Sequence, residues 1–268
     1  MVNLGNDEIV KYPFLTEAGK YLNDKGFSLE QFGSDPDLKK IVDNAFDRII
    51  TSSEGRIFKS DPSSNNSALP LEIFSFLIAV ILLKLSGMNT LIRRFSLAEA
   101  RRAEKFLEKD LMNHQDATKT KLSLQILQEL FSVTVEKTDE TFTILVSDYL
   151  KHSINFHERE WKLINRRVTN GKVHLTPHET VRLVRKELDR HIYTKINSSS
   201  TPEMIVGFET YVDKLKQLAK KFEVKTVESK EFPPCIKHAI EVLEKGENLP
   251  HSGRFMLATF LLNKGQTV

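Results

Sequence analysis

Three polar residues near the end of the chain have the types and the spacing to bind a phosphate group. Asn248 precedes a predicted helix, and His251 and Arg254 lie three positions apart on one face of its first turn. The guanidinium group of Arg254 offers paired donors to a phosphate, and backbone N–H groups at a helix start favour an anion. A structural role is the alternative, in which His251 caps the helix and Arg254 pairs with a nearby acid. The spacing alone leaves both roles open.

A second set of cations lies on a long charged helix that we predict over residues 90–111. Arg94, Arg101 and Lys105 fall on one face of this helix and could line a track for the phosphates of a nucleic acid. The competing interpretation, which the residues favour slightly, is structural. In it, the arginines of this helix pair with acids of the same helix and of the first forty residues.

Motifs for catalysis or for a metal site within this chain are absent from the sequence. His174 and His178 are four positions apart, but Thr176-Pro177 separates them, so they do not share a helix face. The sequence contains no His-Glu-x-x-His motif, no glycine-rich phosphate loop and no Gly-x-Ser-x-Gly nucleophile motif. We therefore predict no catalytic activity for the chain by itself.

The composition indicates an intracellular globular protein. The 268 residues are 40% hydrophobic and 28% charged, and their number predicts one large domain or two small ones. A single cysteine, Cys235, excludes an intramolecular disulfide and a four-cysteine metal site inside this chain. Polar residues interrupt any apolar run near the start, which argues against a signal peptide. The central apolar run, residues 73–83, is much shorter than the roughly 20 residues that span a bilayer, so no membrane association is expected.

The net charge of +3 is unevenly distributed along the chain. Residues 84–109 carry a net charge of +4 and residues 159–190 a net charge of +5, whereas residues 1–40 carry −2. A local basic surface attracts a polyanion even when the total charge is small. Each cluster is equally compatible with a solvated helix face.

The elements that must position these residues are mainly helices. Ser34-Asp35-Pro36-Asp37 predicts a helix start, and apolar residues follow it at helical spacing. The apolar stretch 69–85 predicts a buried central helix that ends at Ser86-Gly87, and the polar segment 60–67 before it predicts a loop.

The hydrophobic pattern then changes to one that is typical of an α+β unit. Alternating residues on both sides of 137–140 predict a β-hairpin. A second hairpin is predicted from strands at 162–168 and 172–176, because Asn170-Gly171 between them favours the tight turn with positive φ angles. Thr176-Pro177-His178-Glu179 forms a capping box, which predicts the start of another helix.

The last part of the chain predicts a helix that starts at Pro202 and runs to Phe222, followed by a separate module with helices at 236–245 and 251–263. Two short helices cannot bury a core of their own, so this module is expected to be incomplete. The predicted fold class is thus mainly α, a helical domain with an inserted small α+β subdomain of two β-hairpins plus helices, followed by the beginning of a helical module. The predicted domains are residues 1–114 with 196–222 (helical domain), 115–195 (α+β subdomain), 223–231 (tether) and 232–268 (C-terminal module).

Several segments resemble the large subunit of archaeal and eukaryotic DNA primase. Phe232-Pro233-Pro234-Cys235-Ile236-Lys237 and the later stretch Asn248–Phe255 resemble the start of the iron–sulfur domain of that family, and the Pro-Pro-Cys and His-x-Gly-Arg pieces are the most specific. Tyr12-Pro13-Phe14-Leu15, Arg93–Ala100 and Glu160–Arg166 resemble further segments of the family in the same order. The resemblance therefore covers essentially the whole chain.

This resemblance implies a non-catalytic regulatory subunit that forms a heterodimer with a small catalytic subunit, which synthesises the RNA primer in DNA replication. It implies that Asn248, His251 and Arg254 contact the single-stranded template and the initiating nucleotide. Cys235 matches the first of four cysteine ligands of a 4Fe–4S cluster. The other three ligands would lie beyond Val268, so this chain alone is not expected to hold the cluster.

The resemblance also places the contact with the catalytic subunit in the N-terminal helical and α+β part. Trp161, Arg166 and Arg167 are the candidates for that interface in the α+β subdomain, although core packing is the first expectation for Trp161. The implied location is intracellular, at the replication machinery. The alternative function is a helical adaptor or scaffold protein with no nucleic-acid role, in which the basic stretches are only solvated faces.

Overall fold

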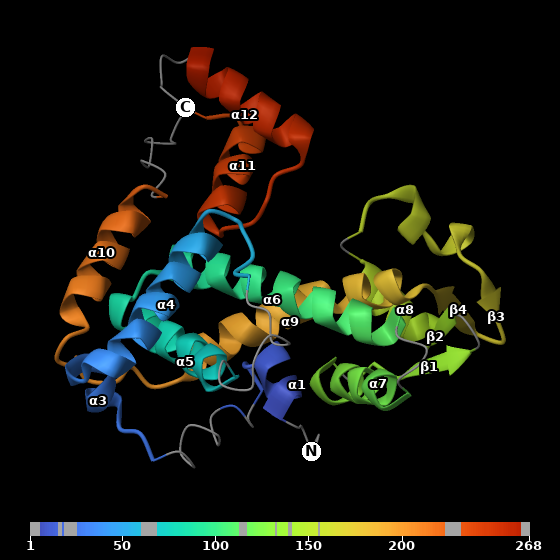
Figure 1. Cartoon of the computed structure of the whole chain (residues 1–268). Coiled ribbons are helices and arrows are strands. Elements are labelled where there is room, and N and C mark those ends of the chain that lie inside the picture. Colours follow the sequence, from blue (N-terminus) through green and yellow to red (C-terminus); the bar gives the residue numbers. More distant parts are fainter. Residues whose placement is uncertain are drawn as a thin grey trace.

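The computed structural model describes residues 6–15, 18, 26–59, 69–112, 117–131, 133–138, 141–154, 156–222 and 232–263. Over these residues the chain is mainly helical and contains one small antiparallel sheet (Figure 1). The predicted fold class is confirmed. The loop predicted at 60–67 and the tether predicted at 223–231 lie outside the described residues.

The helical part is built around α5, which contacts α4 and α10 along its length. Its helices are α1 (Asn6–Lys11), α3 (Leu29–Ser34), α4 (Pro36–Ser53), α5 (Leu69–Ser86), α6 (Asn89–Met112), α7 (Ala117–Phe131) and α10 (Glu209–Lys220). The apolar stretch is thus a buried helix, as predicted. No described helix combines the length and the apolar character that a membrane span needs.

The start of α4 follows the predicted signal. The side chain of Asp35 accepts a hydrogen bond from the backbone N–H of Asp37 at 2.9 Å, and Pro36 occupies the first turn. The helix then buries Ile41 and Ile49 against the core. The helix start and its apolar stripe are confirmed.

A buried ion network joins α4, α5 and α6. Arg48 of α4 is fully buried and donates two hydrogen bonds to the carboxylate of Glu99 on α6, from Nε at 2.7 Å and from Nη2 at 2.8 Å. Its Nη1 donates to Ser75 Oγ at 3.1 Å. Arg102, one turn along α6, donates to the carbonyl oxygen of Val10 at 3.2 Å. These charged side chains link three helices in the core. Their burial leaves them inaccessible to a ligand.

The sheet has the strand order β1-β2-β4-β3, and all neighbours are antiparallel. Its strands are β1 (Val135–Thr138), β2 (Thr141–Leu145), β3 (Val168–Thr169) and β4 (Lys172–Leu175). Phe142 lies opposite Leu175 and Ile144 opposite Val173, and all four side chains are buried. The first predicted hairpin is therefore confirmed.

The second hairpin is confirmed only around its turn. Asn170 and Gly171 have positive φ angles of 51° and 72°, as the Asn-Gly signal requires. The strand predicted over 162–168 is wrong, because β3 contains only Val168 and Thr169, and two 3-10 turns, η1 (Arg159–Trp161) and η2 (Leu163–Asn165), precede it. The short helix α8 (Val146–Ser153) connects β2 to this irregular segment.

Helix α9 (Pro177–Ser198) starts at the predicted capping box. The hydroxyl of Thr176 accepts from the N–H of Glu179 at 3.2 Å, and the carboxylate of Glu179 accepts from the N–H of Thr176 at 2.9 Å. The helix packs along α6 for most of its length, and its first turns contact β2 and β4 (Figure 1). It therefore ties the sheet to the helical part. The domain boundaries remain a prediction.

The helix predicted from Pro202 begins later, at Glu209. A tight crossing with α3 prevents an earlier start. Gly207 has a φ of 93°, and a Cβ atom there would lie 2.5 Å from the carbonyl oxygen of Gly33. Met204, predicted to belong to the apolar stripe, lies in the preceding loop and is exposed. From Glu209 onward the predicted stripe is correct.

The C-terminal module consists of α11 (Pro234–Glu244) and α12 (His251–Asn263), which pack against each other through a small apolar cluster. Gly246 has a φ of 70° and follows α11, where a helix C-cap favours glycine. It also lies against α6, since a Cβ atom there would be 2.9 Å from Cδ of Arg93. Large apolar side chains of α12, such as Phe255, remain exposed.

Candidate functional site

The α+β subdomain is organised around Trp161, the single tryptophan of the chain. Its side chain is only 3% exposed and stacks on Phe156 with ring centroids 4.2 Å apart. The ring of Tyr149 stacks at 6.4 Å, and its hydroxyl donates to the carbonyl oxygen of Trp161 at 2.7 Å. This burial explains why no strand forms here, because the chain must turn sharply to bring the indole into the core.

Arg166 fixes the same segment from its other end. Its Nη1 donates to Glu179 Oε1 at 2.7 Å, its Nη2 donates to the carbonyl oxygen of His174 at 3.2 Å, and its guanidinium carbon lies 5.7 Å from the centroid of Trp161. The hydrogen bond to Glu179 is the main cause that raises the pKa of Arg166 above its ordinary value. Trp161 and Arg166 therefore position the segment and are largely unavailable for direct contact with a partner.

Three side chains close to these two anchors are exposed. Ile164 is 90% exposed, Val168 is 44% exposed, and the Arg167 side chain is exposed and makes no ion pair with any described residue. Figure 1 shows that the chain between α8 and β3 projects away from the rest of the molecule. We call residues 163–168 the Ile164 segment. Sequence reasoning missed Ile164, because its exposure depends on where Trp161 packs.

The three cations predicted to share one face of α6, Arg94, Arg101 and Lys105, do not lie together on its outer surface. Arg94 donates to the carbonyl oxygen of Ser53 at 2.8 Å and stacks on Phe222 at 4.1 Å, so it faces α4 and the end of α10. Burial lowers the pKa of Arg94 below its ordinary value. Arg101 instead lies beside Asp189 of α9. The first of the three is thus committed to packing, and the other two lie farther along the helix.

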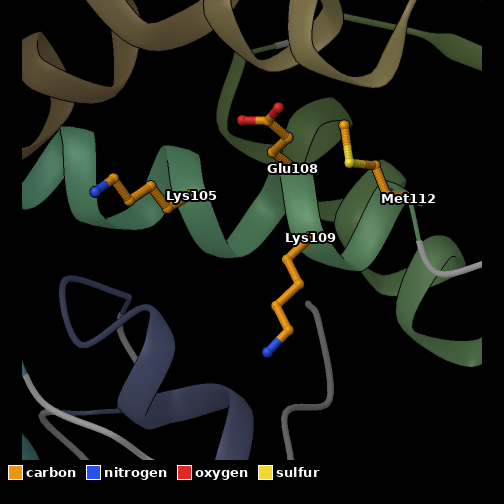
Figure 2. Close-up of a pocket in the computed structure, with 4 residues that line it drawn as sticks. All are labelled: Lys105, Glu108, Lys109 and Met112. Atoms are coloured by element: carbon orange, nitrogen blue, oxygen red, sulfur yellow. The ribbon is translucent and has the colours of Figure 1, made fainter.

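Lys105 is exposed and lines an open hollow of about 350 Å³ on α6. The other described residues that line it are Glu108, Lys109 and Met112 (Figure 2). Figure 2 shows Glu108 and Met112 on one side of the helix and Lys109 pointing away from them. Glu108 is already engaged, because its Oε1 lies 3.0 Å from Nδ1 of His178. Sequence reasoning missed Lys109, because its part in the hollow depends on the surrounding helices.

The phosphate-binding candidates lie at the start of α12. His251 and Arg254 occupy the first turn, and Asn248 lies in the connection before it; all three are exposed. Nε of Arg254 donates to the carbonyl oxygen of Leu249 at 2.9 Å, which holds the guanidinium against the helix start. No described acid pairs with Arg254. The arrangement leaves its two terminal nitrogens free to donate to an anion.

Cys235 is the second residue of α11 and is exposed with a free thiol. In the described part of the chain, no group of three or more His, Cys, Asp or Glu side chains could hold a metal ion. A 4Fe–4S cluster needs four ligands of the thiolate type. The residues present therefore do not fit this cluster on their own, and Cys235 can contribute one ligand at most.

The chain is similar to known proteins over nearly its whole length. The family model for the C-terminal domain of the eukaryotic and archaeal DNA primase large subunit matches residues 225–268. The DNA primase large subunit PriL of Methanosarcina acetivorans is 31% identical over 98% of this chain and 70% of its own length. The homologue from Methanococcoides burtonii is 31% identical over 99% of this chain and 74% of its own, and that from Methanocella arvoryzae is 29% identical over 95% and 68%.

Similarity at this level extends through the helical part, the α+β subdomain and the C-terminal module, and is not limited to a short motif. The chain therefore belongs to the archaeal-type DNA primase large subunit family.

Proposed function

We propose that this protein is a non-catalytic primase subunit that binds a small catalytic subunit through the Ile164 segment. The observation that carries the proposal is the 90% exposure of Ile164, which lies between the two anchored residues Trp161 and Arg166. An exposed large apolar side chain on a rigid support is typical of a residue that fills a pocket of a partner. Val168 and Arg167 beside it add apolar area and a charge at the rim.

The rigidity of the segment comes from the buried anchors. Trp161 packs between two aromatic rings, and Arg166 donates to three acceptors. Because little conformational freedom remains to be lost on binding, a small apolar contact can give useful affinity. The anchors are therefore positioning residues, and Ile164 is the contact residue.

The C-terminal module is proposed to engage the single-stranded template and the initiating nucleotide. Arg254 has free guanidinium donors at a helix start, and His251 lies on the same face one turn away. In a longer chain, Cys235 is proposed to be one of four ligands of a 4Fe–4S cluster. A longer chain that contains the further cysteines should then absorb visible light, and Cys235→Ser should abolish that absorption.

The partner contact is tested by co-expression with a small catalytic primase subunit and size-exclusion chromatography. The wild-type chain is expected to co-elute with the partner, and Ile164→Asp to weaken binding at least tenfold. Val206→Asp is the matched control, because Val206 is also exposed (80%) but lies in the loop before α10. Failure of the wild type to co-elute would support the adaptor alternative instead.

A further inference from the structure

The C-terminal module is joined to the rest of the molecule by few interactions. Its apolar cluster, built around Ile236, Ala239, Leu249 and Leu257, contains no residue of the helical part. Among the residues that the structure describes, no hydrogen bond or ion pair links α11 or α12 to the helices that precede them. Figure 1 shows the two helices projecting from the helical part. A module with its own apolar cluster and a small contact surface can dock and be released as a unit.

A close contact with the helical part is made by Gly246, which follows α11. The three atoms nearest to a Cβ atom at this position would all belong to the side chain of Arg93 on α6, with Cδ at 2.9 Å, Cβ at 3.4 Å and Cγ at 3.8 Å. The φ angle of 70° at Gly246 also favours glycine. The backbone of Gly246 therefore lies directly on the hydrocarbon part of Arg93.

The other end of the Arg93 side chain is held by α9. Its guanidinium carbon lies 4.7 Å from the centroid of the Tyr193 ring, which is a distance typical of a cation–π contact. Tyr193 in turn packs against the main apolar core. Burial raises the pKa of Asp189, also on α9, and the nearby charge of Arg93 is one of those that lower it in part. Arg93 thus connects α6, α9 and the chain between α11 and α12.

We propose that the C-terminal module docks on the helical part through this contact, with the backbone of Gly246 on the side chain of Arg93. Gly246 lies five positions before His251, at the start of α12. Docking therefore sets where the start of α12 lies relative to α6, and release would let α11 and α12 move together. The inference goes beyond the proposed function and does not rest on it, because it concerns a contact within the chain.

The test is the anisotropy decay of a fluorophore attached to Cys235, the single cysteine of the chain, whose thiol is free and exposed on α11. A docked module rotates with the whole chain, whereas a released module adds a faster decay component. Gly246→Ala is expected to raise the ratio of released to docked module about tenfold, because the added methyl group must displace Arg93. Arg93→Ala should raise it about fivefold, since it removes the Cγ and Cδ atoms that lie against Gly246. Arg93→Lys retains these atoms and should behave as the wild type.

Gly87→Ala is the matched control, because Gly87 also follows a helix and has a positive φ angle, 66°, but no described atom lies within 4 Å of a Cβ atom there. It imposes similar backbone strain and should leave the anisotropy decay unchanged. Circular dichroism should show that the variants fold, and Arg93→Ala, which lies outside the module, decides the test if Gly246→Ala unfolds it.

A wild-type decay dominated by the faster component would overturn the inference, as would Gly246→Ala and Arg93→Ala decays equal to that of the wild type. Release by Arg93→Lys as large as that by Arg93→Ala would also overturn it, because the contact would then not depend on the hydrocarbon part of Arg93.

Discussion

The inner and outer faces of α6 use similar charged residues for opposite purposes. On the inner face, Glu99 is 2% exposed and accepts two hydrogen bonds from the fully buried Arg48. On the outer face, Lys105 is exposed and has no hydrogen-bond partner among the described residues. Glu99 and Lys105 belong to the same helix, so the difference comes from what the surrounding helices offer. A buried charge with several partners holds the fold, and an exposed charge without one is free for a ligand.

The largest expected effect is on the inner face. Arg48→Met should lower the free energy of unfolding by about 3–5 kcal/mol, because it leaves the buried carboxylate of Glu99 without its main partner. Chemical denaturation followed by circular dichroism measures this change.

The matched change on the outer face sharpens the contrast. Lys105→Met should alter the unfolding free energy by less than about 0.5 kcal/mol, since Lys105 is exposed and makes no hydrogen bond or ion pair with any described residue. Equal losses in the two variants would mean that the faces do not differ as described.

A smaller loss of stability than that of Arg48→Met is expected when the pH is lowered. Burial alone would raise the pKa of Glu99, but the charges of Arg48 and Arg102 and the hydrogen bonds from Arg48 lower it below its ordinary value of 4.5. The ionised carboxylate therefore stabilises the fold above about pH 4.5, and this contribution is lost as the pH falls through the lowered pKa. Urea denaturation between pH 7 and pH 3 should show a steeper loss for the wild type than for Arg48→Met/Glu99→Gln. Parallel curves would contradict the assignment.

A further effect concerns Asp189 of α9, which lies beside Arg101. Its pKa of about 6 lies above the ordinary 3.8, so its ionisation in the folded state costs stability as the pH rises between these values. Asp189→Asn should therefore raise the unfolding free energy by about 1–2 kcal/mol at pH 7.5 and leave it unchanged near pH 3.5. A destabilised variant at pH 7.5 would show instead that this carboxylate is needed to balance the nearby charges of Arg93, Arg101 and Lys186.

Much of the helical fold could be predicted from the sequence, because its signals are local. The cap at Asp35, the apolar run of α5 and the capping box at Thr176 each act within a few residues. The start of α10 was misplaced because the close approach of Gly207 to Gly33 involves residues more than 170 positions apart. No local pattern reveals such a contact.

The candidate site was less predictable for the same reason. Helical spacing placed Arg94, Arg101 and Lys105 on one face of α6, but it could not show that Arg94 packs on Phe222 while Lys105 borders an open hollow. The alternation over 162–168 suggested a strand, whereas the burial of Trp161 imposes 3-10 turns and exposes Ile164. In both cases, contacts between residues far apart in the sequence determine where the side chains lie.

The position of the single tryptophan gives the protein an intrinsic fluorescence probe. Selective excitation of Trp161 reports only on the α+β subdomain, since the helical part and the C-terminal module contain no tryptophan. Its burial predicts blue-shifted emission in the folded chain and a red shift when this subdomain opens. Comparing that emission with the overall loss of helical signal during denaturation would show whether the subdomain unfolds together with the helices or before them, without any label.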